Sequence, residues 1–154
     1  MSQIELSYED AKQNIIEEIK KRQFMVLATS EKDRVYARTM GFIPDGLSVF
    51  FIMRPATRKY GQIAANPNVA VADGNLQIEG VARSSGHPFA ERNTRIMEIW
   101  KEMNPRLYES AAKIYPRQPE RELFEVVPRR IALYKNPVFH DVSEPYWHIL
   151  YVNE

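Results

Sequence analysis

The residues most able to do chemistry are Thr57, Arg58 and Lys59, which stand where an apolar run ends and a helical pattern begins. The first turn of a helix has unpaired backbone N–H groups and the positive end of the helix dipole, so it suits a phosphate. The Thr57 hydroxyl adds a donor. The two cations add charge, which is unfavourable at a helix start unless an anion lies among them. On these three residues alone, an ordinary N-cap with solvated cations is the commoner structure.

Arg38 is the second candidate, because it shares the mostly apolar face of a predicted strand with Tyr36, Met40 and Phe42. An arginine in that setting either extends to solvent or meets an anion, and a carboxylate of the protein is the commoner partner. The sequence identifies no such carboxylate.

Other reactive groups form no recognisable pattern. Cysteine is absent, so thiol nucleophiles, disulfides and cysteine-bound metals are excluded. His87, His140 and His148 lack metal-ligand spacing, and each is interpreted as a packing or surface histidine. We therefore predict no metal site and assign no catalytic residue, and any redox chemistry requires a bound cofactor.

Length and charge narrow the class of protein. The chain has 154 residues, and we expect a single domain over 1–154. A net charge of +1 gives no general electrostatic case for nucleic acid binding. No apolar run is long enough for a membrane helix and no signal-like core opens the chain, which together favour a cytoplasmic protein.

The elements that must position these residues are mostly short strands. An N-terminal helix is expected over Ser7–Arg22, from apolar residues at helical spacing. The remaining expected elements follow in chain order. They are strands at 24–29, 34–43, 47–53, 68–72, 76–83 and 123–134, a short helix at 57–66, and helices at 88–103 and 105–114. Five to seven antiparallel strands with inserted helices predict an α+β fold, mainly β, built as a small closed or nearly closed barrel.

Two local features carry expectations of their own. Gly80 lies inside a predicted strand, which suggests a bulge or a close backbone approach. The aromatic tail Tyr146–Tyr151 is expected to dock on a neighbouring surface, such as another subunit.

Five segments, taken in order, resemble the pyridoxamine 5′-phosphate oxidase-like family of FMN-binding split β-barrels. No single segment is specific, but their order and spacing together are, and they cover about Phe24 to Arg83 well. They are LATS (27–30), ARTMGF (37–42), PDGLSVFFIM (44–53), TRKYGQIAANPNVAV (57–71) and LQIEGVA (76–82). The resemblance implies an antiparallel split barrel of about six strands, and it reverses the odds against a phosphate site at Thr57 and Arg58.

The resemblance also implies a homodimer with FMN at the subunit interface. The FMN-binding residues that it implies are Arg38, Thr39 and Met40 along the ring and ribityl chain, Ile52 and Met53 through their backbone, Thr57, Arg58 and Lys59 at the phosphate, and Asn75 reaching from the partner subunit.

The implied activity is that of a general flavoprotein. True oxidases of this family carry a tryptophan and an Asp-Arg pair near the C-terminus; here Val127 stands at the tryptophan position and no Asp-Arg follows. This departure argues against vitamin B6 oxidation. The resemblance implies an FMN-dependent oxidoreductase that passes electrons or hydride from a nicotinamide donor to a small-molecule substrate. The alternatives are a non-catalytic flavin-binding or sensing module, or a split barrel that uses deazaflavin or haem.

Overall fold

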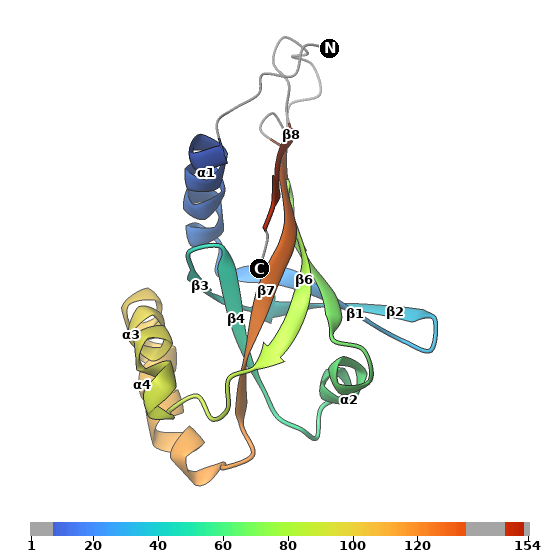
Figure 1. The fold of residues 1–154 in the computed structure, drawn as a ribbon. Helices are drawn as coiled ribbons and strands as arrows, with labels where there is room; N and C mark the ends of the chain where they lie inside the picture. The colour runs from blue at the N-terminus through green and yellow to red at the C-terminus, as the bar shows by residue number, and fades with distance from the viewer. Residues whose placement is uncertain (1–7, 135–146, 153–154) are drawn as a thin grey trace.

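A computed structural model describes residues 8–134 and 147–152, whose strands form one antiparallel sheet (Figure 1). The strand order is β2-β1-β5-β6-β7-β4-β3, and β8 adds to β7. The strands are β1 (Phe24–Glu31), β2 (Arg34–Gly41), β3 (Ile43–Asp45), β4 (Ser48–Met53), β5 (Asn68–Asp73), β6 (Leu76–Ser84), β7 (Glu122–Tyr134) and β8 (Trp147–Tyr151).

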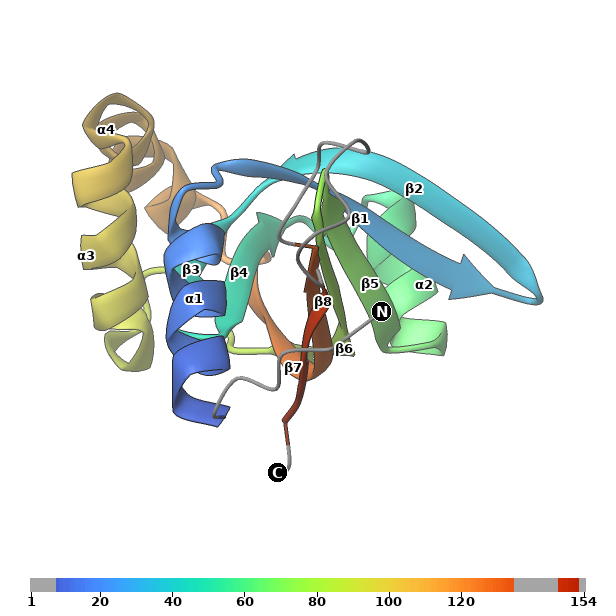
Figure 2. The ribbon, with the colours of Figure 1, turned by 90° about the horizontal axis from the view of Figure 1, so that it is seen from above.

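Four α-helices in the described ranges lie around the sheet. They are α1 (Tyr8–Lys20), α2 (Arg58–Ala65), α3 (Thr94–Met103) and α4 (Pro105–Ile114). Figure 2 shows α3 and α4 side by side at one end, and α2 beneath the projecting β1–β2 hairpin. None of the described helices is long and apolar enough to cross a membrane.

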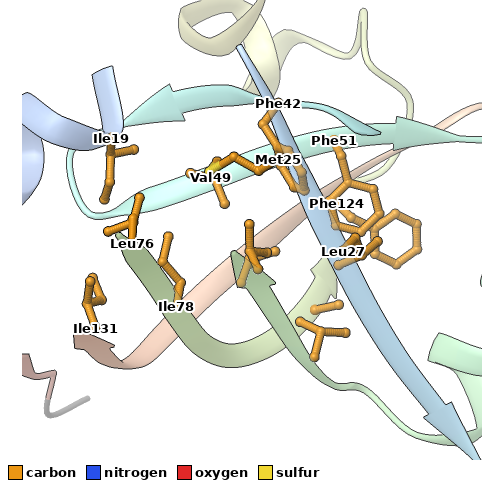
Figure 3. Packing of buried hydrophobic residues seen from close by; sticks show 14 of the residues in the cluster. Ile19, Met25, Leu27, Phe42, Val49, Phe51, Leu76, Ile78, Phe124 and Ile131 are labelled. Atoms are coloured by element: carbon orange, nitrogen blue, oxygen red, sulfur yellow. The ribbon is translucent and has the colours of Figure 1, made fainter. Parts of the chain in front are cut away.

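The main core fills the inside of the curled sheet (Figure 3). Met25 and Leu27 contribute from β1, and Phe51 stacks on Phe124 with ring centroids 5.6 Å apart. Ile19 of α1 is fully buried in the same cluster, so the N-terminal helix packs onto this core.

Gly80 gives the sheet part of its curvature. The β6–β7 register shifts between Glu79 and Gly80, which marks a bulge. A Cβ at this position would collide with the Val127 carbonyl oxygen, so only glycine lets the two backbones approach this closely. Both parts of the sequence expectation for Gly80 are confirmed.

The expected α+β split barrel is confirmed, with eight strands where about six were expected. One extra strand arises because the predicted strand at 34–43 divides at Phe42, whose N–H bonds to the Gln23 carbonyl oxygen at 2.9 Å. The chain there passes from the β2 edge to β3, which pairs with β4. The ends of the strand order, β2 and β3, do not pair, so the barrel stays split.

Three further expectations are corrected. Pro44 and Asp45 lie in β3 rather than in a turn, and Gly46 makes the turn with φ of 62°. The helix expected at 88–103 begins only at Thr94. Before it the chain is held in turns by buried Asn93, which donates to the carbonyl oxygens of Ser85 and His87.

The C-terminal tail was expected against a neighbour, but its described part joins the chain's own sheet as β8. Leu150 pairs with Ile131 of β7 and is buried in the core. Tyr146 lies outside the described residues.

Candidate functional site

Arg38, Arg58 and Lys59 line one hollow of about 480 Å³, although two of them are 20 residues or more from the third in the sequence. The guanidinium of Arg38 comes from β2, while Arg58 and Lys59 form the first turn of α2, whose N-cap is Thr57. The hollow therefore combines three cations with the positive end of a helix dipole. The sequence placed these residues at one site, and the fold brings them together.

Thr57 does not cap its helix in the usual way. Its hydroxyl donates to the Arg54 carbonyl oxygen at 2.7 Å, and no side chain accepts from the first-turn N–H groups of α2. Those N–H groups remain available to a ligand. The hydroxyl oxygen of Thr57 keeps its acceptor capacity but has given up its donor.

Arg38 is fixed by three hydrogen bonds to neutral acceptors. Nη1 donates to the Leu27 carbonyl oxygen at 3.2 Å and to the Thr29 hydroxyl at 2.8 Å. Nη2 donates to Gln62 Oε1 at 2.9 Å. Thr29 donates in turn to the same Gln62 oxygen at 2.6 Å, which closes a ring of three side chains from β2, β1 and α2.

The positive charges lack acidic partners in the described part of the chain. No ion pair there includes Arg38, Arg54, Arg58 or Lys59. Burial lowers the pKa of Arg38, and the neighbouring Arg58 lowers it further. Burial also lowers the pKa of Lys59, with Arg38 and Arg54 adding to the effect. Folding has thus gathered cations that an anion would stabilise.

Tyr36 contacts this cluster from β2. The guanidinium carbon of Arg58 lies 4.4 Å from the centroid of the Tyr36 ring, a cation–π contact. Because Arg58 is exposed, the aromatic ring limits where its side chain can go.

A second, apolar groove of about 190 Å³ adjoins the end of β2. No Lys, Arg, Asp or Glu lines it. Its lining residues are Gln23, Phe24, Met40, Gly41, Phe42, Ile43, Phe51, Ile52, Trp100, Asn104, Leu107 and Tyr115. Met40 follows Arg38 on the same face of β2, one pleat or roughly 7 Å further along. The cationic hollow and the apolar groove therefore follow each other along one strand.

The other predicted residues are placed less directly. The Thr39 side chain is exposed and, by strand alternation, faces away from Arg38. Met53 is buried in the core, so only its backbone is open to a ligand. The β3 pairing ends at Phe50, which leaves Ile52 and Met53 bonded to β7 on one side only within the described sheet.

Asn75 lies apart from both hollows, in the β5–β6 turn. Its Oδ1 accepts from Arg22 Nη2 at 2.6 Å, and its Nδ2 donates to the Tyr134 carbonyl oxygen at 2.7 Å. Within one subunit it therefore ties α1 to the sheet.

Sequence reasoning missed Thr29, Gln62, Tyr36 and Arg54. Thr29 and Gln62 are buried polar side chains, 2% and 1% exposed. The one available signal was spacing: Gln62 stands four residues after Arg58, hence on the same face of the helix. Nothing in the sequence pairs it with Thr29, 33 residues earlier.

Comparison with known proteins bears on the family. The sequence model described as pyridoxamine 5′-phosphate oxidase matches residues 11–135. The chain belongs to this family. No curated protein matches the sequence significantly.

Solved structures share the fold of this pyridoxamine 5′-phosphate oxidase family member. A putative pyridoxamine 5′-phosphate oxidase from Listeria innocua is 24% identical, with TM-score 0.57 over 81% of this chain and 96% of that one. General Stress Protein 26 from Bacillus anthracis is 19% identical, with TM-score 0.57 over 82% and 92%. HutZ, the haem storage protein from Vibrio cholerae, is 16% identical, with TM-score 0.57 over 82% and 91%. At these identities the likeness shows the fold alone.

Proposed function

We propose that this chain is an FMN-binding flavoprotein that works as a homodimer and passes electrons or hydride from a nicotinamide donor to a small molecule. The observation that carries the proposal is the run of Arg38, Arg58 and Lys59, without acidic partners in the described residues, beside an apolar groove along β2. A ligand that fits both has an anionic end and a flat apolar body.

The cationic hollow would hold the FMN phosphate. A phosphate monoester carries a charge of roughly −1.5 to −2 at pH 7, which offsets the mutual repulsion of the cations. Arg58 and Lys59 would donate from the first turn of α2, together with its free backbone N–H groups. Arg38 would donate from β2.

The apolar groove would hold the ring end of FMN. Met40 and Ile52 line it, and the backbone of Ile52 and Met53 is open on the side away from β7. FMN supplies the electron and hydride chemistry when bound, and the protein positions it and keeps charge and water arranged around it. No side chain is assigned as a general acid or base.

The homodimer proposal rests on the outer face of β1, β2 and β5. Phe24, Val26 and Val35 are 60%, 38% and 74% exposed on this face. Such an apolar surface favours association with a second copy. Asn75 of each subunit would then reach the partner's flavin through its second Nδ2 proton, which has no partner in the described residues.

Haem is the second candidate, because HutZ shares the fold. A haem needs an axial ligand, and His87 does not offer one freely. Its Nε2 bonds to the carbonyl oxygens of Tyr115 and Gln118, and its Nδ1 accepts from the Phe89 N–H. This engagement favours flavin over haem at the described histidine nearest the groove. Deazaflavin and a non-catalytic flavin module remain outcomes of the tests below.

The phosphate assignment is tested by the double substitution of Arg58→Ala with Lys59→Ala. FMN affinity should fall by several kcal/mol, since each charge-assisted contact contributes about 1.5–3 kcal/mol. Riboflavin affinity should change little, because riboflavin has no phosphate. Flavin fluorescence quenching on titration measures both.

The matched control is Lys12→Ala with Lys20→Ala on α1, which removes the same charge far from α2 (Figure 1). Its FMN affinity should equal that of the unmodified protein. Equal losses for FMN and riboflavin in the α2 variant would show that the phosphate lies elsewhere.

A further inference from the structure

The hydrogen bonds of Arg38 use one part of its guanidinium and leave another part unused. A guanidinium has five N–H groups. Three are engaged by Leu27, Thr29 and Gln62, as given above. The two that remain are the Nε–H and one Nη2–H, which lie together on one edge of the plane. That edge is the one that binds a carboxylate or phosphate through two parallel hydrogen bonds.

The acceptors on the protein side are all neutral: a carbonyl, a hydroxyl and an amide oxygen. Hydrogen bonding therefore orients Arg38 without cancelling its charge, as a Glu or Asp partner would. The orientation of Gln62 is also fixed, because two donors, Thr29 and Arg38, converge on its Oε1. Burial of both acceptor side chains protects this ring of hydrogen bonds from water.

From this geometry we infer that Thr29 and Gln62 are positioning residues that hold Arg38 with its two-donor edge toward a phosphate oxyanion while leaving its full charge for that anion. The inference rests on the proposed function, since it takes the anion to be the phosphate of FMN. It adds two residues, on β1 and α2, to the requirements for binding, although neither touches the ligand.

The hydroxyl of Thr29 is tested with two near-isosteric variants. Thr29→Val keeps the shape and removes the hydroxyl, so FMN affinity should fall about tenfold, consistent with losing one hydrogen bond to a charged group. Thr29→Ser keeps the hydroxyl and should restore affinity to within about twofold. Riboflavin affinity should be the same in all three proteins. Equal FMN affinity in Thr29→Val and the unmodified protein would overturn the role of Thr29.

Gln62→Glu separates orientation from charge. A carboxylate at this position still accepts from Thr29 and Arg38, so thermal stability should be equal or higher. It neutralises Arg38, however, so FMN affinity should fall tenfold or more while riboflavin affinity is unchanged. A purely structural role for Gln62 would leave the FMN affinity of this variant intact, and that result would contradict the inference.

Failure of the proposed function is separable from failure of the inference. If the unmodified protein binds no FMN, the proposed function falls. The positioning of Arg38 is then judged with inorganic phosphate, which should raise the thermal midpoint of the unmodified protein and not that of Gln62→Glu. Equal shifts in both proteins would overturn the inference.

Discussion

At the scale of single residues, the site is defined by what its cations lack. Surface arginines of this chain find carboxylates, as Arg95 does with Asp45 at 3.0 Å. Arg38 instead meets only neutral oxygens, and Lys59 lies partly buried among positive charges. Such an arrangement opposes folding unless a ligand supplies negative charge, so it marks a binding site rather than a stabilising network.

The lowered pKa of Lys59 predicts a pH dependence. Its pKa in the folded protein lies below the ordinary 10.5, so the charged lysine opposes folding at neutral pH, and this cost disappears as pH rises toward 10.5. Bound phosphate favours the charged form. The ratio of FMN affinity to riboflavin affinity should therefore fall as pH rises through the lowered pKa of Lys59.

Lys59→Arg is the control, because arginine stays charged over this range. Fluorescence titrations from neutral pH to 10.5 should show a falling ratio for the unmodified protein and a flatter one for Lys59→Arg. Parallel curves would mean that Lys59 does not contact the phosphate.

At the scale of elements, the β1–β2 hairpin serves two surfaces. Its inner face presents Arg38 and Met40, and its outer face presents apolar side chains such as Val26. Strand alternation separates the two sets, so one hairpin can contribute both to the ligand site and to a subunit contact.

Val26→Lys tests the outer face as the subunit contact. A charge buried in an apolar interface is unfavourable, so this variant should sediment as a monomer while the unmodified protein sediments as a dimer. Ile114→Lys on α4, at a side chain 49% exposed, is the matched control and should remain dimeric. A dimeric Val26→Lys protein would place the contact elsewhere.

The sequence was most informative where the pattern is local. Alternation in β2 correctly put Tyr36, Arg38 and Met40 on one face, since the side-chain period of a strand is two. Gly80 was recognised because a glycine inside a strand needs a local reason. By contrast, the contact between Thr29 and Gln62 depends on how α2 packs on β1, which no local pattern encodes. The strand β8 was missed for a similar reason, because its pairing with β7 is a tertiary choice.

At the scale of the whole molecule, the split in the barrel matters most. The sheet ends at β2 on one side and β3 on the other, and the apolar groove has residues of both β2 and β4 in its lining. The helical pair α3–α4 adds Trp100 and Leu107 to its wall. A fold that closed completely would fill this space with side chains, whereas the split form leaves room for a flat ligand.

The visible absorbance spectrum of the freshly purified protein, with the released cofactor identified after denaturation, tests the central claim most directly. The account predicts a flavin spectrum and release of about one FMN per chain. A Soret band would contradict it in favour of haem. A colourless protein that also fails to bind added FMN would overturn the assignment of the cationic hollow to the FMN phosphate.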